Sequence, residues 1–155
     1  MKNNECIFSP DRKYRYTLWR VWEPNKQYCQ FIGLNPSKAD EKINDNTVRR
    51  CINYAKDWGF GALVMTNIFA WRETKAELML LEKEPIGIDN DKYLLQCAQD
   101  AGIIIAAWGN HGKHLNRGEY VKNMIPNLHC LKISKEGKPW HPLYLKKDLK
   151  PIFYK

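Results

Sequence analysis

Three polar side chains in this 155-residue chain have types and positions that suit hydrolytic chemistry. Asn35 ends the apolar run FIGL, and its amide oxygen can orient a water molecule. Asn67 follows GALVMT, and its amide can both donate to and accept from the edge of a heterocycle. His141, in the segment WHPLYL, can donate a hydrogen bond as a neutral imidazole. Together they suit a reaction in which water attacks one group while another leaves.

Each of these residues also has an ordinary structural explanation. Asn35 precedes Pro36, and Asn–Pro sequences start turns well. Asn67 can bond to nearby backbone at a strand end, and Trp108, which follows a later apolar run, is a type common in protein cores. His141 precedes a proline, which favours extended backbone. The sequence leaves both kinds of explanation open.

The elements that must position these residues alternate between strands and helices. Two β-rich runs, 14–22 and 28–34, are joined by EPNKQ and predict a hairpin. Buried strands are expected over GALVMTNIF, GIIIAAWG and LHCLKI. Helices are expected between them, with one capped by Thr47, one capped by Asp89 or Asn90, and a short one over 117–124.

This order predicts right-handed crossovers and a mostly parallel sheet with helices on both faces. The expected fold is α/β: a three-layer αβα sandwich with a mostly parallel four-stranded central sheet plus an N-terminal antiparallel hairpin strand. At 155 residues, the chain is expected to form a single α/β domain over 1–155.

Polar or aromatic groups follow each expected strand, where parallel sheets gather their ligands beyond the strand ends. These stretches should therefore meet at one rim of the sheet and form a site. They are Asn35-Pro36-Ser37, Asn67 with Ala70-Trp71-Arg72, Trp108-Gly109-Asn110-His111 and Trp140-His141-Pro142.

The charge of the chain points toward a polyanionic partner. The net charge is +8, and seven lysines against two acidic residues place +5 of it between Lys132 and the C-terminus. Such a segment is either a solvated tail or a surface for a phosphate backbone. A helix opens with Asp45, Asn46, Thr47, Arg49 and Arg50, and this helix start is either a phosphate site or a capped, solvated end.

Membrane, metal and disulfide chemistry are not expected. No apolar run approaches the ~20 residues that span a bilayer, and the N-terminus lacks a signal-peptide pattern, so a cytoplasmic protein is expected. The five cysteines are scattered without a C-x-x-C pair, which predicts reduced thiols. His111 and His114 have a spacing that suits metal ligands, but no nearby carboxylate or cysteine completes a site. No cofactor is expected.

Four stretches in order resemble the motif series of the uracil-DNA glycosylase superfamily: FIGLNPS, LVMTNIFAWR, IIIAAWGNHGKH and WHPLYL. The resemblance covers about residues 30–145. Asn35 stands where the best-known uracil enzymes have a water-activating aspartate, and Leu143-Tyr144-Leu145 stand where serine, proline and leucine are usual. The whole sequence also resembles the bacterial and phage domain of unknown function 1643 family, which implies no activity.

The glycosylase resemblance implies an enzyme that hydrolyses the N-glycosidic bond of a damaged or modified base in DNA, after flipping that base into a pocket. Asn35 and His141 are then the catalytic residues. The base-binding residues are Gly33, Leu34, Asn67, Phe69 and Trp71, where Phe69 or Trp71 provides the stacking ring. The DNA-binding residues are Ser37, Arg49, Arg50, Asn110, His111, Lys113, Leu143, Tyr144 and Lys146.

Two other functions stay open from the sequence. One is a non-catalytic nucleic-acid-binding module, and the other is an enzyme that acts on free nucleosides or nucleotides. Asp40, Glu41 and Asp45 lie near Asn35 in the sequence, and one of them can fold back to supply the missing carboxylate. Leu143 and Tyr144 suit either a wedge that fills the gap left by a flipped base or the end of a core strand.

Overall fold

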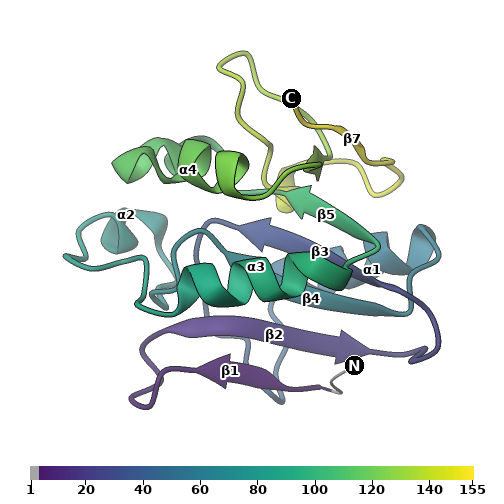
Figure 1. Cartoon of the computed structure of the whole chain (residues 1–155), viewed down its shortest axis with the longest axis horizontal. Helices are drawn as coiled ribbons and strands as arrows, with labels where there is room; N and C mark the ends of the chain where they lie inside the picture. The colour runs from purple at the N-terminus through teal and green to yellow at the C-terminus, as the bar shows by residue number, and fades with distance from the viewer. Residues whose placement is uncertain (1–3) are drawn as a thin grey trace.

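The fold is built on a seven-stranded mixed sheet with the order β1-β2-β4-β3-β5-β6-β7 (Figure 1). A computed structural model describes residues 4–155 of the chain. The strands in chain order are β1 (Cys6–Phe8), β2 (Arg15–Val21), β3 (Tyr28–Gly33), β4 (Ala62–Asn67), β5 (Ile103–Ala106), β6 (His129–Cys130) and β7 (Ile152–Phe153).

The α/β class is confirmed, but the sheet is larger than predicted. Strands β4, β3, β5 and β6 run parallel to one another. β2 and β1 extend one edge in antiparallel directions, and β7 does the same at the other edge. The short strands β1 and β7 were not predicted, and the expected strand over 128–133 is only two residues long.

The predicted hairpin between β2 and β3 is wrong, because β4 lies between these two strands. β4 pairs antiparallel with β2 and parallel with β3. All six residues of β4 are buried, so this apolar strand takes a central position with a partner along each edge. Local sequence showed two β-rich runs and a turn but not the strand that separates them.

Four helices accompany the sheet: α1 (Asn46–Asp57), α2 (Ala76–Met79), α3 (Asn90–Asp100) and α4 (Arg117–Met124), with 3-10 segments η1 (Asn110–Asn116) and η2 (Pro142–Tyr144). α4 has the predicted bounds. The cap predicted at Thr47 is wrong: Asp45 is the N-cap, and its carboxylate accepts from the backbone N–H of Val48 at 2.9 Å. Thr47 is the second residue of the helix and so lies past the N-cap position.

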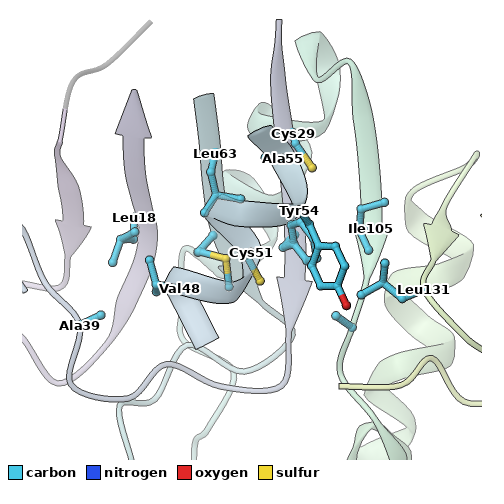
Figure 2. Packing of buried hydrophobic residues seen from close by; sticks show 13 residues of the cluster. Leu18, Cys29, Ala39, Val48, Cys51, Tyr54, Ala55, Leu63, Ile105 and Leu131 are labelled. Atoms are coloured by element: carbon cyan, nitrogen blue, oxygen red, sulfur yellow. The ribbon is translucent and has the colours of Figure 1, made fainter. Parts of the chain in front are cut away.

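One face of the sheet is covered by α1 and the other by α3 and α4 (Figure 1). On the first face, Val48, Cys51 and Ala55 of α1 pack against strand residues such as Leu63 (Figure 2). Their spacing of three and four residues puts them on one side of the helix. On the second face, Leu94 of α3 packs in the other buried cluster.

Alternation along the central strands supplies both clusters. Phe31 belongs to the α1 side and its neighbour Ile32 to the α3 side, while Ile105 and Ile104 divide in the same way. Both faces are therefore apolar, as expected for a parallel sheet covered by helices. The buried polar pair Gln30 and Thr66 interrupts this pattern, and the Nε2 of Gln30 donates to the hydroxyl of Thr66 at 3.1 Å.

The cysteines are free thiols, and burial raises the pKa of Cys29 and Cys51 well above the ordinary value. They therefore act as small apolar core residues. Within residues 4–155, no helix combines the length and the apolar character needed to cross a bilayer.

Truncation of the α1-side cluster should destabilise the protein strongly. Leu63 is fully buried, so Leu63→Ala should lower the free energy of unfolding by ~2–5 kcal/mol through lost burial and the cavity left behind. Urea denaturation followed by circular dichroism measures this. Leu81 is 80% exposed, and Leu81→Ala should change stability by less than ~0.5 kcal/mol. Equal losses in the two variants would contradict the packing described here.

Candidate functional site

A cleft of about 1180 Å³ lies beyond the carboxyl ends of β3, β4 and β5. Gly33, Asn67 and Ala107, at or just after these strand ends, line it. The start of α1 and the segment 132–144 complete its walls. Its volume exceeds the ~300–1,000 Å³ of ordinary small-molecule pockets. Each of the four stretches thus contributes at least one residue to the cleft. Of the second stretch only Asn67 does so, since Ala70, Trp71 and Arg72 do not line it.

Most of the predicted site residues line this cleft. They are Gly33, Leu34, Asn35, Ser37, Arg49, Asn67, Asn110, His111, His141, Leu143 and Tyr144. The predicted residues that do not line it are Arg50, Phe69, Trp71, Lys113 and Lys146.

The two rings expected to stack on a base lie elsewhere. After β4 the chain continues beside β3, where the backbone N–H of Phe69 donates to the carbonyl of Leu34 at 3.0 Å. This turns Phe69 into the α3-side core, where it is fully buried. Trp71 lines a separate, smaller pocket. The site prediction from strand order could not distinguish which side of the chain these rings would take.

Three of the cations predicted to contact DNA also lie outside the cleft. Lys113 is exposed on η1, outside the cleft. Arg50 is half-buried in α1, and its Nη1 has no partner in the described part of the chain. The carbonyl of Lys146 accepts from the hydroxyl of Tyr54, which ties the C-terminal segment to α1.

The amide of Asn35 joins the loops that leave β3 and β4. Its Nδ2 donates to the carbonyl of Glu73 at 2.8 Å and to that of Pro36 at 3.2 Å. It also lies 3.5 Å from the carbonyl oxygen of Trp71. Three surrounding carbonyls fix which amide atom is the nitrogen. The Oδ1 of Asn35 accepts no hydrogen bond from the described residues, so it stays available to water or a ligand.

Asn67 lies against Gly33, its partner in the β3–β4 register. A Cβ at position 33 would come within 2.7 Å of the Asn67 Oδ1, so only glycine permits this approach. Asn67 is 3% exposed, and its Nδ2 has no hydrogen-bond partner among residues 4–155. Asn90 holds this strand end by donating to the carbonyl of Asn67 at 2.8 Å. The result is a fixed, unsatisfied amide donor on the cleft wall.

His141 is held as a neutral donor. Its Nδ1 accepts from the backbone N–H of Leu143 at 3.2 Å, which leaves the proton of the neutral ring on Nε2. Burial lowers the pKa of His141, and the negative charge of Asp45 opposes that shift in part. Nε2 makes no hydrogen bond within the described chain, so it can donate to a ligand at neutral pH.

Of the three carboxylates near Asn35 in the sequence, only Asp45 lines the cleft. Asp40 accepts from the backbone N–H groups of Lys42 and Ile43, both at 2.9 Å, which lowers its pKa. Glu41 forms a two-bond ion pair with Arg12 at 2.8 and 2.9 Å. Asp45 caps α1 and acts electrostatically on His141.

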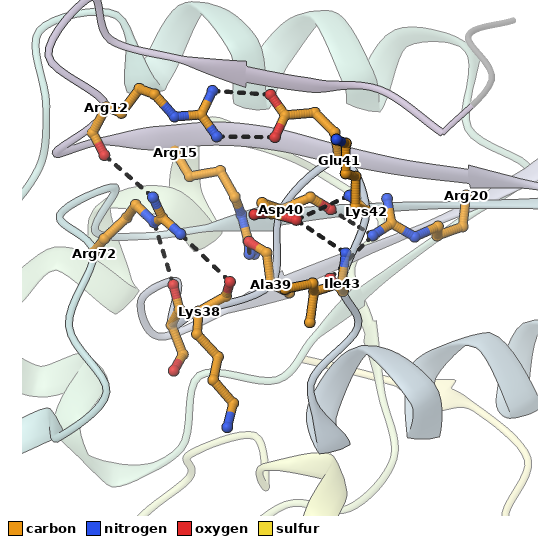
Figure 3. Close-up of polar contacts among 11 residues, drawn as sticks. Arg12, Arg15, Arg20, Lys38, Ala39, Asp40, Glu41, Lys42, Ile43 and Arg72 are labelled. Carbon is orange, nitrogen blue, oxygen red and sulfur yellow. Dashed lines mark hydrogen bonds and ion pairs between the residues drawn. The ribbon is translucent and has the colours of Figure 1, made fainter.

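Arginines hold the loop that carries Asn35 (Figure 3). Arg15 donates to the carbonyl of Ala39 at 2.9 Å. Arg20 donates to the carbonyl of Ile43 at 3.2 Å, and Arg72 donates to that of Ser37 at 3.3 Å. Loop carbonyls that lack a strand partner are thus satisfied by side chains from β2 and from the loop after β4.

Arg15 reaches this position because of an irregularity in β2. Ile7 pairs with Thr17 but Phe8 pairs with Arg15, so the intervening Tyr16 is an extra residue. This bulge puts Arg15 on the α1 side of the sheet beside the cleft. Arg15 is 2% exposed, and its Nε has no partner in the described structure. Burial lowers the pKa of Arg15 to about 10, which keeps it charged at neutral pH.

The sequence reasoning missed Arg15, and it placed Trp140 in one of the rim stretches without giving it a role. Trp140 lines the cleft, its buried Nε1 has no partner in residues 4–155, and Lys132 lies 4.6 Å from its ring. Its place beside His141 was the available signal. Arg15 gave none, because a bulge cannot be read from the pattern. Within the described chain, no three histidine, cysteine, aspartate or glutamate side chains gather as a metal site requires.

A family model described as "Protein of unknown function (DUF1643)" matches residues 15–143. The chain belongs to the DUF1643 family. The matched span begins at Arg15 and ends at Leu143, and both of these residues line the cleft. No curated protein and no solved structure matches the chain. The match therefore covers every described residue that lines the cleft except Tyr144, and the family description names no activity.

The contact between Gly33 and Asn67 predicts strong coupling. Gly33→Ala should lower the free energy of unfolding by ~1–3 kcal/mol, because the new methyl group meets the Asn67 amide oxygen. In an Asn67→Ala background this cost should largely disappear, since the nearest remaining atom, the carbonyl oxygen of Thr66, lies 3.9 Å away. Urea unfolding of the four proteins measures the coupling. Additive losses would show that position 33 has room for a side chain.

The environment of His141 predicts a pH dependence. Its NMR titration midpoint should lie below the ordinary value of 6.5. Since the unfolded chain then binds more protons below pH 6.5, His141 should make stability fall as the pH drops through and below that value. His141→Gln assigns the resonance and should remove this component of the pH dependence. A midpoint at or above 6.5 would contradict the buried, neutral state.

Proposed function

We propose that this protein is a DNA glycosylase-like enzyme that hydrolyses the N-glycosidic bond of a damaged or modified base. One observation carries the proposal. Asn35, Asn67 and His141 come from three distant segments, line one cleft, and each keeps a hydrogen-bonding atom without a partner in the described chain. The resemblance of four motifs to the uracil-DNA glycosylase superfamily, and the uracil-DNA glycosylase-like fold that it implies, support the same reaction.

In the proposed reaction, Asn35 positions the attacking water through its Oδ1. The bond from C1′ of the sugar to the base nitrogen breaks first, and the water oxygen then bonds to C1′. The added water then loses one proton to bulk water, and the departed base takes up one proton from bulk water, so the protons balance. Because an amide is a weak base, Asn35 orients the water and does not deprotonate it. The carboxylate of Asp45, which also lines the cleft, acts electrostatically on His141 and Arg15.

Stabilisation of the departing base falls to the donors of the cleft. Negative charge develops on the base as the bond breaks, and the Nε2–H of neutral His141 can donate to it. The Nδ2 of Asn67 is a second donor held without a competing partner in the described chain. One such preorganised donor typically lowers a barrier by ~3–4 kcal/mol.

The surface around the cleft supports nucleic acid as the substrate. Lys132, Lys135 and Lys138 line one wall, and Arg49 lines another. These cations can contact phosphates without reading sequence. Tyr144 is 77% exposed at the tip of η2, where an aromatic side chain can fill the gap left by a flipped base.

A labelled-duplex assay tests the proposal. Duplexes carrying one deaminated, alkylated or hydroxymethylated base are incubated with the protein, and abasic sites are revealed by alkaline strand cleavage. At least one duplex should be cut. Asn35→Ala and His141→Ala should each lower the single-turnover rate by ~10²-fold or more. His129 lies outside the cleft, so His129→Ala should cleave like the parent.

The other outcomes identify different functions. If no substrate is cleaved while the folded protein binds DNA, and binding survives Asn35→Ala, the protein is a non-catalytic binding module. If it releases bases from free nucleosides or nucleotides but does not shift DNA in a gel, it is a nucleoside- or nucleotide-processing enzyme. Either result would overturn the glycosylase assignment.

A further inference from the structure

A second pocket of about 400 Å³ adjoins the cleft and is named here the Trp71 pocket. Ser37 and Thr74 line both hollows, and the Ser37 hydroxyl donates to the Thr74 hydroxyl at 3.2 Å. Lys38 and Glu73 are also shared between them. The two loops joined by the amide of Asn35 thus form a ridge, with the cleft on one side and the Trp71 pocket on the other.

The Trp71 pocket carries an excess of positive charge. It is lined by Arg12, Lys13, Lys38 and Arg72, with Glu73 as its acidic member. Arg12 is neutralised by its ion pair with Glu41. No carboxylate within residues 4–155 lies at ion-pair distance from the remaining three cations. Two of these, Lys13 and Lys38, are exposed lysines free to meet an anion.

Two other lining side chains, Arg72 and Trp71, are held rigidly. Arg72 lies 4.8 Å from the centre of the Phe8 ring and donates to the carbonyls of Lys38 and Arg12, both at 3.4 Å. The Trp71 ring meets the ring of Tyr14 edge-on, with centroids 5.3 Å apart. The Trp71 Nε1 donates no hydrogen bond to any described residue. A fixed cation and a fixed indole therefore stand beside two mobile ammonium groups.

This combination suits one class of ligand. A positively charged groove with an aromatic side chain binds the backbone and unpaired bases of nucleic acids. Free anions of small size need the cations but not the indole, and apolar ligands need the indole but not the cations. A polymer also explains why the hollow adjoins the cleft, since a strand in one can continue into the other.

We propose that the Trp71 pocket binds the sugar–phosphate backbone of the nucleic-acid strand that continues past the cleft over the Ser37–Thr74 ridge. Lys13 and Lys38 contact phosphates there, and Trp71 lies beside the adjacent nucleotide. The inference rests on the proposed function, because it takes the strand to be the one whose base enters the cleft.

Salt-dependent binding tests this inference without any cleavage. Affinity for an unmodified fluorescein-labelled duplex is measured by anisotropy between ~50 and ~200 mM KCl, where each phosphate contact adds ~0.9 to the slope of log K against log salt. Lys13→Ala/Lys38→Ala should reduce that slope by ~1.8. Lys83 and Lys92 line neither pocket, so the charge-matched control Lys83→Ala/Lys92→Ala should keep the parent slope.

Equal slopes in the two double variants would overturn the inference, as would absence of DNA binding. Competition separates the polymer from a free nucleotide. Unlabelled duplex and adenosine monophosphate are compared at the same nucleotide concentration, and adenosine monophosphate should displace the labelled duplex poorly. If both competitors displace it equally, backbone binding is refuted. The duplex carries no cleavable base, so a protein without glycosylase activity can still show the slope change. Conversely, cleavage without a slope change refutes the Trp71 pocket alone.

Discussion

The shape of the cleft depends on the amide nitrogen of Asn35, which ties the loop after β3 to the loop after β4 through carbonyls of both loops. These loops leave neighbouring parallel strands and would otherwise expose unpaired carbonyls. The guanidinium groups of Arg15, Arg20 and Arg72 extend the same principle along the first loop. Side-chain donors thus replace the backbone hydrogen bonds of a strand pair, and the loop beyond the end of β3 gains a fixed conformation.

The loop uses side-chain N–H groups as hydrogen-bond donors, while other buried N–H groups in the cleft have no acceptor among the described residues. The Nδ2 of Asn67, the Nε1 of Trp140 and the Nε of Arg15 are buried without partners in the described chain. An unsatisfied buried donor costs ~1–3 kcal/mol. The protein therefore keeps a set of destabilising N–H groups on the walls of one cleft. A ligand rich in acceptors, such as a base carbonyl or a phosphate, would relieve that cost, which matches the ligand class proposed above.

The sequence predicted those parts of the structure in which local pattern and long-range packing agree. The apolar runs GALVMT and GIIIAA were predicted to be buried strands, with Asn67 and Trp108 at one rim beyond them, and both runs form strands inside the sheet. The α4 helix followed from its own pattern. The failures have one cause: they concern neighbours far apart in sequence. Three features show this: the separation of β2 from β3, the bulge at Tyr16, and the turn that buries Phe69. Each depends on which distant segment pairs with a strand or packs in the core.

The same reasoning explains how the proposed chemistry is distributed among the cleft residues. Asn35 has its nitrogen committed to two loops, so its oxygen can orient water but its amide cannot accept a proton. Among residues 4–155, four carboxylates line the cleft, those of Asp45, Glu73, Glu77 and Glu136. Asp45 has one oxygen committed to the start of α1. Asn35 and Asp45 are therefore poorly suited to a mechanism in which a strong base must activate the water before the bond breaks. Bond cleavage that runs ahead of water attack is well served, since His141 and Asn67 offer donors to the leaving base. In the proposed reaction, departure of the base therefore precedes capture of the sugar by water.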